Sequence, residues 1–402
     1  MKKILVASTA LVAAGMITAG SASASEKIKL NLGGYSKWWV VGAWQEGSYE
    51  AGIGDGSASA NNVDVKGENE VWFGGSTTLD NGLKVGIDMQ LRAGGHTDSS
   101  TSTASGNTAS DTIDESYVWV EGGFGKVIVG TENNGTYLLH VTAPDAAGNW
   151  NEGGVMTGNT AIAKPTNVTS LPNGNTTAII TDGDADKLTY VAPSFYGLTL
   201  GASYVPNVNE DNHNVFGAGG STTNAATDIY GVGALYANTF GGVGVKVSAG
   251  WVTYDASAST DNSTELALGT QLSYAGFTLG GSYRDVSQNG GGITSGVNNN
   301  ASTGLASATG YGWDIGLQYA TGPYAVSLAY FNSKTQGANN TLSGEDEITF
   351  WQLSGKYSMG AGVDLVASAG YAEFDDEQEK AATDDTNHNE GWTVMTGLSL
   401  SF

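Results

Sequence analysis

The last eleven residues, Trp392–Phe402, read W-T-V-M-T-G-L-S-L-S-F, and the two sides of this stretch differ in character. Apart from Thr396, the even positions are large and apolar, whereas the odd positions are small or polar except for Met395. A period of two is the pattern of a β-strand, because successive side chains point to opposite faces of a sheet. One apolar face and one polar face indicate that this strand lies between lipid and water.

The rest of the chain favours strands over helices as the membrane-spanning elements. Lys2 and Lys3, the apolar run Ile4–Ile17 and the small residues Ala22–Ala24 form a signal peptide, so we predict that residues 1–24 are removed. Beyond that point no apolar run approaches the roughly 18 residues that a membrane helix needs. The chain instead holds 60 glycines at a hydrophobic fraction of 40%. Residues 25–402 are predicted to form one barrel domain, closed because hydrocarbon offers no partners for open strand edges.

Sixteen stretches combine apolar alternation with flanking turn residues, and we predict a strand in each. An even number suits a bacterial single-chain antiparallel barrel. The predicted strands are Lys27–Gln45, Glu68–Leu79, Leu83–Arg92, Ser116–Glu121, Gly125–Glu132, Lys187–Ala192, Leu198–Val205, Tyr230–Ala237, Val243–Tyr254, Glu265–Tyr274, Phe277–Arg284, Gly312–Ala320, Tyr324–Phe331, Thr349–Tyr357, Val363–Ala372 and Trp392–Phe402.

The connections between these strands alternate between very short and long. Asp80-Asn81-Gly82 and Ala275-Gly276 are short turns, whereas residues 93–115 and 286–311 are long loops. In transmembrane barrels short turns face the periplasm and long loops face the outside. The third long loop, Asn133–Asp186, is the longest. A structureless stretch of this length in a compact domain is unusual and tends to be functional.

Charged residues are absent from the assigned lipid face of these strands. In Leu83–Arg92, for example, the apolar residues occupy one face and Lys84, Asp88 and Arg92 occupy the other. A cation at the bilayer midplane of a barrel costs about 2–4 kcal/mol. A soluble β-sandwich also alternates, but it does not favour aromatic residues at both ends of its strands. Here Tyr, Trp and Phe gather near the short turns and again near the long loops, as at two membrane interfaces.

The mature chain resembles the general porins of Gram-negative bacteria, particularly the sixteen-stranded trimeric ones. The most specific similarities are Leu79–Gly86, L-D-N-G-L-K-V-G, which is similar to the family's second hairpin turn, and Lys187–Tyr204, K-L-T-Y-V-A-P-S-F-Y-G-L-T-L-G-A-S-Y. The terminal Phe402 matches the signal that the barrel assembly machinery recognises in such proteins. The resemblance implies a homotrimer in the outer membrane, in contact with its lipid and lipopolysaccharide. It also implies that the third loop folds into each water-filled pore.

The chain departs from this family in its shortage of arginine. Arg92 and Arg284 are its only arginines, and Gly130-Thr131-Glu132 stands where relatives often carry Gly-Arg. We therefore do not transfer a fixed arginine ladder. Basic residues outnumber acidic ones on the inward face of the predicted strands, so we assign a slightly basic barrel wall. The whole chain has a net charge of -24, and the excess of acidic residues therefore lies in the loops and turns. The predicted basic lining is Lys37, Lys84, Arg92, Lys126, Lys246 and Arg284; the predicted acidic lining or constriction is Asp88, Glu121, Glu132, Asp145, Glu152 and Asp314.

Acidic residues of the third loop are expected to face the wall lysines across the lumen. Such an arrangement produces a transverse field, and the acidic vestibule concentrates cations. We therefore predict weak cation selectivity. Asp182, Asp184 and Asp186 also form a weak candidate for a Ca²⁺ site, although they lack the glycine and later glutamate of a calcium loop. No other cofactor is predicted.

Passive diffusion of ions and small hydrophilic solutes through an open channel is the leading function. The chain has no cysteine, and its four histidines fall in separate loops without the spacing of a metal site. No nucleophile or phosphate-binding motif is present either, so an enzyme is not expected. The acidic balance argues against nucleic acid as a partner. The alternative function is a substrate-specific channel with a charged or aromatic track along Tyr35, Trp39, Trp72, Tyr117 and Trp119.

Overall fold

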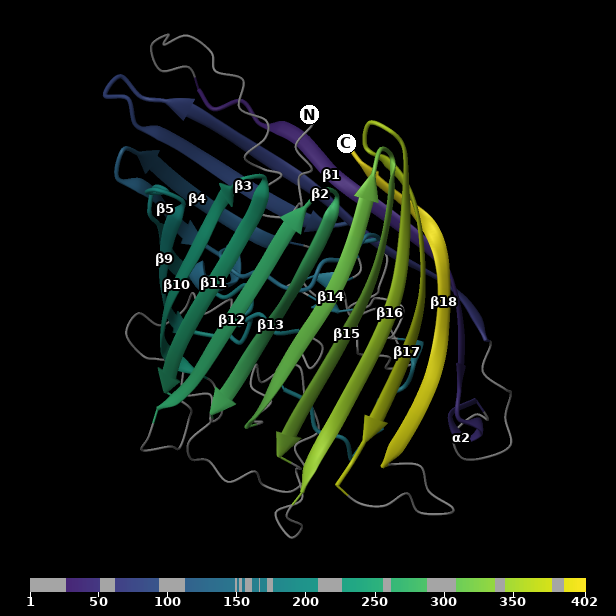
Figure 1. The fold of residues 1–402 in the computed structure, drawn as a ribbon. Coiled ribbons are helices and arrows are strands. Elements are labelled where there is room, and N and C mark those ends of the chain that lie inside the picture. Colours follow the sequence, from purple (N-terminus) through teal and green to yellow (C-terminus); the bar gives the residue numbers. More distant parts are fainter. Residues whose placement is uncertain are drawn as a thin grey trace.

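A computed structural model shows a closed barrel of sixteen antiparallel strands (Figure 1). It describes residues 27–50, 62–93, 113–148, 150–151, 154–155, 161–165, 167–171, 176–208, 226–255, 262–287, 309–336, 344–377 and 387–402. The predicted signal peptide lies outside these residues. Each of the sixteen predicted strands coincides with one strand of the barrel, so the fold prediction is confirmed.

The strands follow one another around the barrel in sequence order. They are β1 Asn31–Gln45, β2 Val63–Thr78, β3 Lys84–Arg92, β4 Ile113–Gly122, β5 Gly125–Gly130, β8 Lys187–Val191, β9 Leu198–Asn207, β10 Thr227–Phe240, β11 Val243–Asp255, β12 Ser263–Tyr274, β13 Phe277–Ser287, β14 Gly310–Thr321, β15 Tyr324–Gln336, β16 Glu345–Gly360, β17 Val363–Asp375 and β18 His388–Ser401. A separate two-stranded sheet joins β6, Trp150–Asn151, to β7, Gly154–Val155. The short helices are α2, Gly47–Glu50, and α3, Gly135–Leu138.

The barrel closes where the last strand meets the first. Strand β18 pairs with β1 over eleven residues, from Tyr35 opposite Ser401 to Gln45 opposite Gly391. Beyond this ladder the backbones of Gly34 and Phe402 exchange two hydrogen bonds of 3.1 Å. A Cβ on Gly34 would lie 2.3 Å from the carbonyl oxygen of Glu70, so only glycine fits at this closure. No strand edge is left open to the hydrocarbon.

The strand ends that short turns join gather at one rim of the barrel, and the strand ends that long connections join gather at the other (Figure 1). We call these the short-turn rim, which is periplasmic in such barrels, and the long-loop rim. The turn Asp80-Asn81-Gly82 places Gly82 at φ +83, and Gly276 has φ +89 in the β12–β13 turn. Glycine accepts these left-handed angles without strain, which lets the strands reverse within a few residues.

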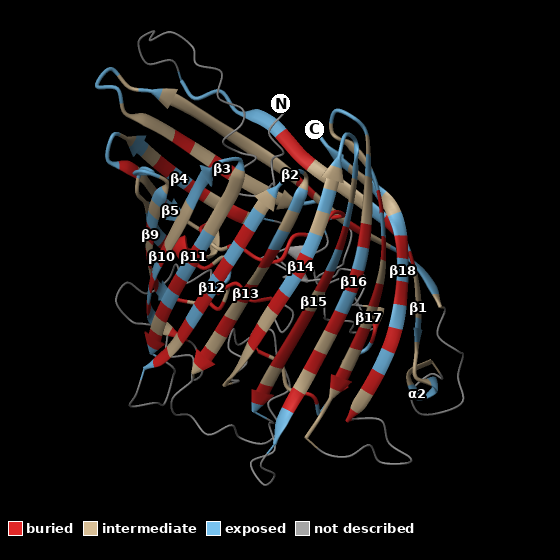
Figure 2. Ribbon diagram, in the orientation of Figure 1, coloured by how far each residue is buried: buried red, intermediate tan, exposed pale blue. Residues whose placement is uncertain are grey.

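Exposed and buried residues alternate along the strands, as Figure 2 shows for β12, β16 and β18. The large exposed residues of these strands are apolar and form the outer face. In β18, Trp392 and Val394 are 61% and 54% exposed, whereas Thr393 and Met395 are each 2% exposed. Among the described residues, no helix is long and apolar enough to cross a bilayer. The outward residues of the strands form a large exposed apolar band, and this band is the lipid-facing surface.

Aromatic side chains form contacts along both rims of the outer face. Near the short turns, ring centroids of Phe277 and Tyr319 lie 4.5 Å apart, and those of Tyr324 and Tyr357 lie 5.0 Å apart. Near the long loops, Tyr371 and Trp392 lie 4.9 Å apart. These are the two aromatic girdles expected at the two membrane interfaces.

One test compares the two faces of the same strand. Leu317→Arg on the outer face is expected to lower the free energy of unfolding in lipid vesicles by about 2–4 kcal/mol, because the cation enters hydrocarbon. Leu317 is 48% exposed to that side, whereas the next residue, Gln318, points into the barrel. Gln318→Arg is the matched control and should change stability by less than about 0.5 kcal/mol. Equal losses for the two variants in urea titrations would contradict this assignment of faces.

Candidate pore and its loop

The third long loop spans residues 131–186 between β5 and β8, and its described parts lie against the inside of the barrel. Helix α3 starts this inward path, and the Asn134 Oδ1 caps it by accepting from the backbone N–H groups of Thr136 and Tyr137 at 2.8 and 2.9 Å. The Gly135 N–H donates to the Ser203 Oγ of β9 at 2.8 Å. Gly201 and Gly233 let the loop backbone approach, since a Cβ there would lie 3.0 and 2.6 Å from the Gly135 carbonyl oxygen.

Backbone N–H groups attach the loop to successive strands of the inner wall. Val141 donates to the Ser248 Oγ of β11 at 3.1 Å, and Ala146 donates to the Ser327 Oγ of β15 at 2.8 Å. Between them, Ala143 donates to the Asp314 Oδ1 of β14 at 3.1 Å. These bonds satisfy backbone groups that are buried between loop and wall. The strands therefore dictate the path of the loop.

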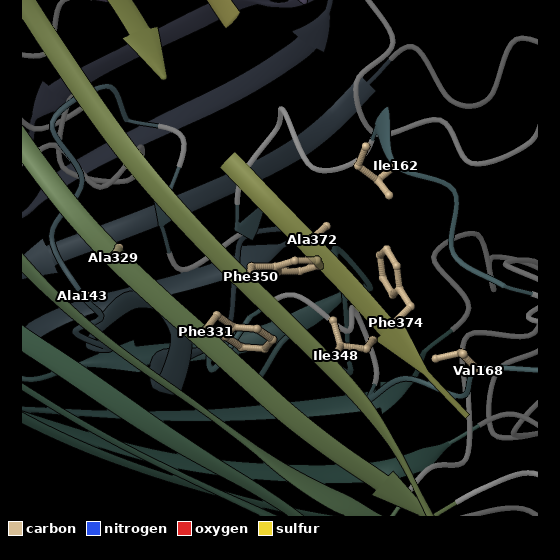
Figure 3. Packing of buried hydrophobic residues seen from close by; sticks show 9 residues of the cluster. All are labelled: Ala143, Ile162, Val168, Ala329, Phe331, Ile348, Phe350, Ala372 and Phe374. Atoms are coloured by element: carbon tan, nitrogen blue, oxygen red, sulfur yellow. The ribbon is translucent and has the colours of Figure 1, made fainter. Parts of the chain in front are cut away.

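Apolar contacts hold a further part of the loop against β15, β16 and β17. Figure 3 shows Ala143, Ile162 and Val168 of the loop beside inward side chains of these strands. The strand residues of this cluster are Ala329, Phe331, Ile348, Phe350, Ala372 and Phe374. The Phe331 and Phe350 rings stack with centroids 5.8 Å apart. Such an apolar lining inside a barrel is explained by the loop that covers it.

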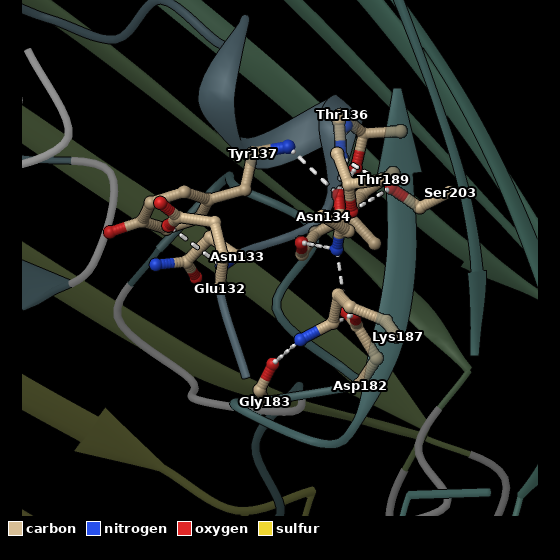
Figure 4. A network of polar contacts seen from close by, with 12 residues as sticks. Glu132, Asn133, Asn134, Thr136, Tyr137, Asp182, Gly183, Lys187, Thr189 and Ser203 are labelled. Atoms are coloured by element: carbon tan, nitrogen blue, oxygen red, sulfur yellow. Dashed lines mark hydrogen bonds and ion pairs between the residues drawn. The ribbon is translucent and has the colours of Figure 1, made fainter. Parts of the chain in front are cut away.

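The two ends of the loop are tied together by a buried polar network (Figure 4). The Asn134 Nδ2 donates to the Ile179 carbonyl at 3.1 Å and also to the Asp182 carboxylate. The Lys187 ammonium lies 3.7 Å from the other Asp182 oxygen and donates to the Gly183 carbonyl at 3.0 Å. Burial raises the pKa of Asp182, and Lys187 opposes that shift by stabilising the carboxylate.

A second buried anchor joins the returning part of the loop to β12 and β13. The Arg284 Nε and Nη2 donate to the Glu265 Oε2 at 3.0 and 2.6 Å, and both side chains are 0% exposed. The loop residue Thr181 accepts from Arg284 at 3.2 Å and donates to Glu265. We call this group of three the β12–β13 clamp. It fixes the loop by charge-assisted hydrogen bonds in a site that water does not reach.

A family model described as Gram-negative porin matches residues 7–377. The chain belongs to the Gram-negative porin family. An anion-selective porin from Comamonas acidovorans shares 14% identity, with a TM-score of 0.59 over 94% of this chain and 100% of that one. A porin refined at 1.8 Å resolution shares 16% identity, with a TM-score of 0.56 over 93% of this chain and 100% of its own.

A loop L8 deletion mutant of OmpT, an outer membrane protein of Vibrio cholerae, shares 11% identity, with a TM-score of 0.55 over 94% of this chain and 100% of that one. At such identities the likeness concerns the fold. A search of curated proteins found no match. Family and barrel together place this porin in the outer membrane of a Gram-negative bacterium.

The predicted basic residues of the porin wall have different surroundings. Lys84 and Lys126, at the short-turn ends of β3 and β5, lie on the ring of Trp119, with Nζ atoms 5.7 and 4.8 Å from its centroid. Lys37 forms an ion pair of 3.3 Å with Glu68. Arg92 forms one of 2.5 Å with Asp114 at the long-loop end. Lys246 is half-buried on the inner face of β11.

Two predicted lining residues are covered by the loop instead of facing water. Arg284 belongs to the β12–β13 clamp, and Asp314 is 4% exposed beneath the Ala143 backbone. Both point inward, as alternation requires, but Arg284 is paired with Glu265 of β12, and Asp314 accepts a hydrogen bond from the loop backbone. The alternation along a strand shows which residues face inward, but it does not show whether another segment of the chain covers those residues.

The predicted acidic residues also separate into groups. Asp88 and Glu132 are 8% and 3% exposed, and Glu121 is exposed at the short-turn end of β4. Asp145 accepts from the Ser327 Oγ at 3.0 Å, on the β15 side. Glu152 lies outside the described residues. Asp182 does not form the expected pair across the lumen. Its carboxylate instead pairs with Lys187, the first residue of β8, where the loop ends.

The inward carboxylates of Glu68 and Glu115 were missed by the sequence reasoning. Tyr35 donates from its hydroxyl to Glu68 and Glu70, at 3.0 Å each. The Glu115 carboxylate accepts from the Gln90 Nε2 at 2.6 Å. Glu68 shares the face of Glu70 two residues away, so alternation was a sufficient signal for it. Glu115 lies just before Ser116, where the sequence predicted this strand to start, whereas the observed strand β4 already begins at Ile113.

The candidate aromatic track is largely covered. Trp39, Tyr117 and Trp119 are 1%, 4% and 7% exposed, whereas Tyr35 and Trp72 are half-buried with ring centroids 5.8 Å apart. A solute sliding along aromatic faces needs those faces open to the lumen. The arrangement therefore gives no support to the substrate-specific alternative.

The three aspartates of the candidate Ca²⁺ site are in different environments. Asp182 is buried, Asp184 is half-buried and Asp186 is exposed. Among the described residues, the group of three carboxylates with oxygens within 4.8 Å of one another is Asp346, Asp376 and Glu377 at the long-loop rim.

Proposed function

We propose that this porin forms a water-filled channel for passive diffusion of ions and small hydrophilic solutes, with a weak preference for cations. The third loop sets the size limit in this proposal. The observation that carries it is the inward loop, attached to the wall at Ser248, Asp314, Ser327 and the β12–β13 clamp. A family and fold of this kind favour a channel over an enzyme.

The cation preference rests on the inner wall near the long-loop rim. Acidic side chains gather there on β2, β3 and β4 and at the start of the loop: Glu68, Glu70, Asp88, Glu115 and Glu132. Of the cations nearby, Lys37 and Arg92 are held in ion pairs, whereas Lys66 forms none within 4.0 Å among the described residues. A narrow passage lined by one sign of charge raises the local concentration of the opposite ion. The fold alone does not decide this sign, since the porin from Comamonas acidovorans with a similar barrel is anion-selective.

We propose further that three copies associate through the outer face of β1–β5. Every strand from β8 to β18 carries an outward aromatic residue, whereas outward positions of β3, β4 and β5 hold aliphatic ones such as Val85, Ile87, Val118 and Val129. On the outer face of β1 and β2, the Ser36 hydroxyl donates to the Asn69 amide oxygen. The polar pair on β1 and β2 and the gap in the aromatic girdle over β3–β5 suit contact with protein better than contact with lipid. Strand β1 itself carries the outward aromatic residues Trp38 and Trp44.

Planar-bilayer recording of the refolded mature protein tests this function. We expect conductance steps in groups of three and, under a KCl gradient, a reversal potential of cationic sign. Replacing Glu68 and Glu115 by glutamine should lower the cation-to-anion permeability ratio about twofold, because two lumen charges are lost and Lys37 is released. Glu390→Gln removes a carboxylate from the outer face of β18 and is the matched control.

The outcomes separate the parts of the proposal. A reversal potential of anionic sign contradicts the selectivity, and single steps contradict the trimer. Folded protein without conductance contradicts the channel itself.

A further inference from the structure

The inward charges of this barrel are sorted along its axis. In the β2–β5 wall, Lys84 and Lys126 are the first and second residues of their strands at the short-turn rim. Glu70 lies opposite Arg92, at the other end of β3 from Lys84. Eight residues of strand separate Lys84 from Arg92, which corresponds to roughly 26 Å along the chain. The β2–β5 wall thus has ammonium groups near the short-turn rim and carboxylates near the long-loop rim.

The remaining inner wall repeats this order. Lys246 is the fourth residue of β11 and lies toward the short-turn rim. Lys356, the fifth residue from the end of β16, lies there too but is paired with Asp364 at 3.8 Å. Glu265 is the third residue of β12 and Asp314 the fifth of β14, so both lie toward the long-loop rim. Glu265 is paired with Arg284, so Lys246 and Asp314 are the residues that extend the charge separation beyond the β2–β5 wall.

Ion pairing strengthens the separation. Near the long-loop rim three cations are neutralised: Arg92 by Asp114, Lys187 by Asp182 and Arg284 by Glu265. Lys66 of β2 also faces inward there and forms no ion pair within 4.0 Å among the described residues. At the short-turn rim, Lys84 and Lys126 form no ion pair within 4.0 Å among the described residues; Glu121 is their neighbour in the ladder on both sides. We call these two lysines the lysine collar. Its charge remains available to ions in the lumen.

We propose that this axial separation makes the porin a rectifying channel that conducts better when the extracellular side is positive. The inference rests on the proposed open pore. At that polarity cations enter through the acidic half and anions enter through the lysine collar, so both ions accumulate in the pore. At the opposite polarity each ion meets the zone of its own sign first, and the pore is depleted of carriers. A transverse field alone produces no such dependence on polarity.

The experiment is single-channel recording of the wild-type porin at both polarities and at two salt concentrations. We expect a conductance ratio of about 1.5 or more in 0.1 M KCl, where the Debye length is about 10 Å. In 1 M KCl, where that length is about 3 Å, the ratio should fall to near 1. Orientation is marked by Gly123→Cys in the β4–β5 turn and an impermeant maleimide on one side. The chain has no cysteine of its own, and a Cβ at Gly123 has no atom within 4 Å.

Two variants locate the effect. Lys84→Gln with Lys126→Gln should bring the ratio in 0.1 M KCl to about 1, because the collar is removed. Lys66→Gln is the matched control: Lys66 also faces inward, opposite Trp39, but in the half of β2 near the long loops. Its loss should maintain or increase the ratio. Equal conductance of oriented wild-type channels at both polarities overturns the proposal, as does an equal loss of rectification in both variants. Absence of any conductance instead overturns the channel function on which the inference rests.

Discussion

Glu265→Ala is expected to lower the free energy of unfolding by about 3–5 kcal/mol, because it leaves the Arg284 guanidinium buried without a counter-charge. Both side chains are 0% exposed and are joined by bonds of 3.0 and 2.6 Å. The loss exceeds that of an ordinary surface ion pair, since water does not reach the site to solvate the remaining charge. Urea titration of the barrel in lipid vesicles measures it.

The same variant should disturb the channel as well as the fold. Thr181 of the loop donates to Glu265 and accepts from Arg284, so loss of Glu265 removes one of these two bonds between loop and wall. We expect noisier open-channel current in planar bilayers. The noise readout is independent of the unfolding measurement, because it is taken on barrels that have folded.

Two controls define the cause. Asp364→Ala breaks the Lys356–Asp364 pair, whose atoms are 3.8 Å apart and whose side chains are 35% and 30% exposed, and it should cost less than about 1 kcal/mol. Glu265→Leu combined with Arg284→Met removes both buried charges and should recover most of the stability, although the loop stays detached. A Glu265→Ala loss no greater than that of Asp364→Ala would show that the clamp carries little energy.

Gly269→Ala is expected to displace the third loop and to lower the single-channel conductance. Gly269 faces inward on β12, and a Cβ there would lie 1.9 Å from the Val141 carbonyl oxygen and 2.8 Å from the Ser248 Oγ. The clashing atom belongs to the loop backbone and not to a flexible side chain, so the loop backbone must shift away from the wall. That shift is into the lumen, and overpacking of this kind costs about 1–3 kcal/mol.

The conductance is best measured in 1 M KCl, where screening leaves pore size as the main variable. Gly355→Ala is the matched control, because the nearest atom to its Cβ would be the Ala325 carbonyl oxygen at 4.0 Å. It should leave conductance unchanged. Wild-type conductance in a folded Gly269→Ala barrel would mean that the loop does not bound the passage.

Most of the fold was predictable from the sequence because alternation is a local property. Trp392–Phe402 showed one lipid-facing side, and the structure exposes Trp392 and Val394 while it buries Thr393 and Met395. The same period placed Lys84 and Asp88 on the inner face. Short turns such as Asp80-Asn81-Gly82 set the strand order, because a turn of that length joins only neighbouring antiparallel strands.

The sequence did not show whether an inward charged side chain is paired, covered by the loop or open to water. Arg284 and Lys84 look alike in their strands, yet the loop covers Arg284 and pairs it with Glu265, while Lys84 lies at a rim beside Trp119. Asp182 appeared as a loop carboxylate facing the lumen and instead neutralises Lys187.

What the sequence by itself determined is thus the set of strands, their two faces, the closure and the lengths of the connections. The tertiary structure decided the path of residues 131–186, the β12–β13 clamp and the sorting of charge along the axis. The physical reason is that the two kinds of feature depend on interactions over different separations along the chain. Side-chain alternation is imposed by the backbone within a few residues, whereas a charge is paired, covered or left free by segments that barrel closure brings together from more than a hundred residues away.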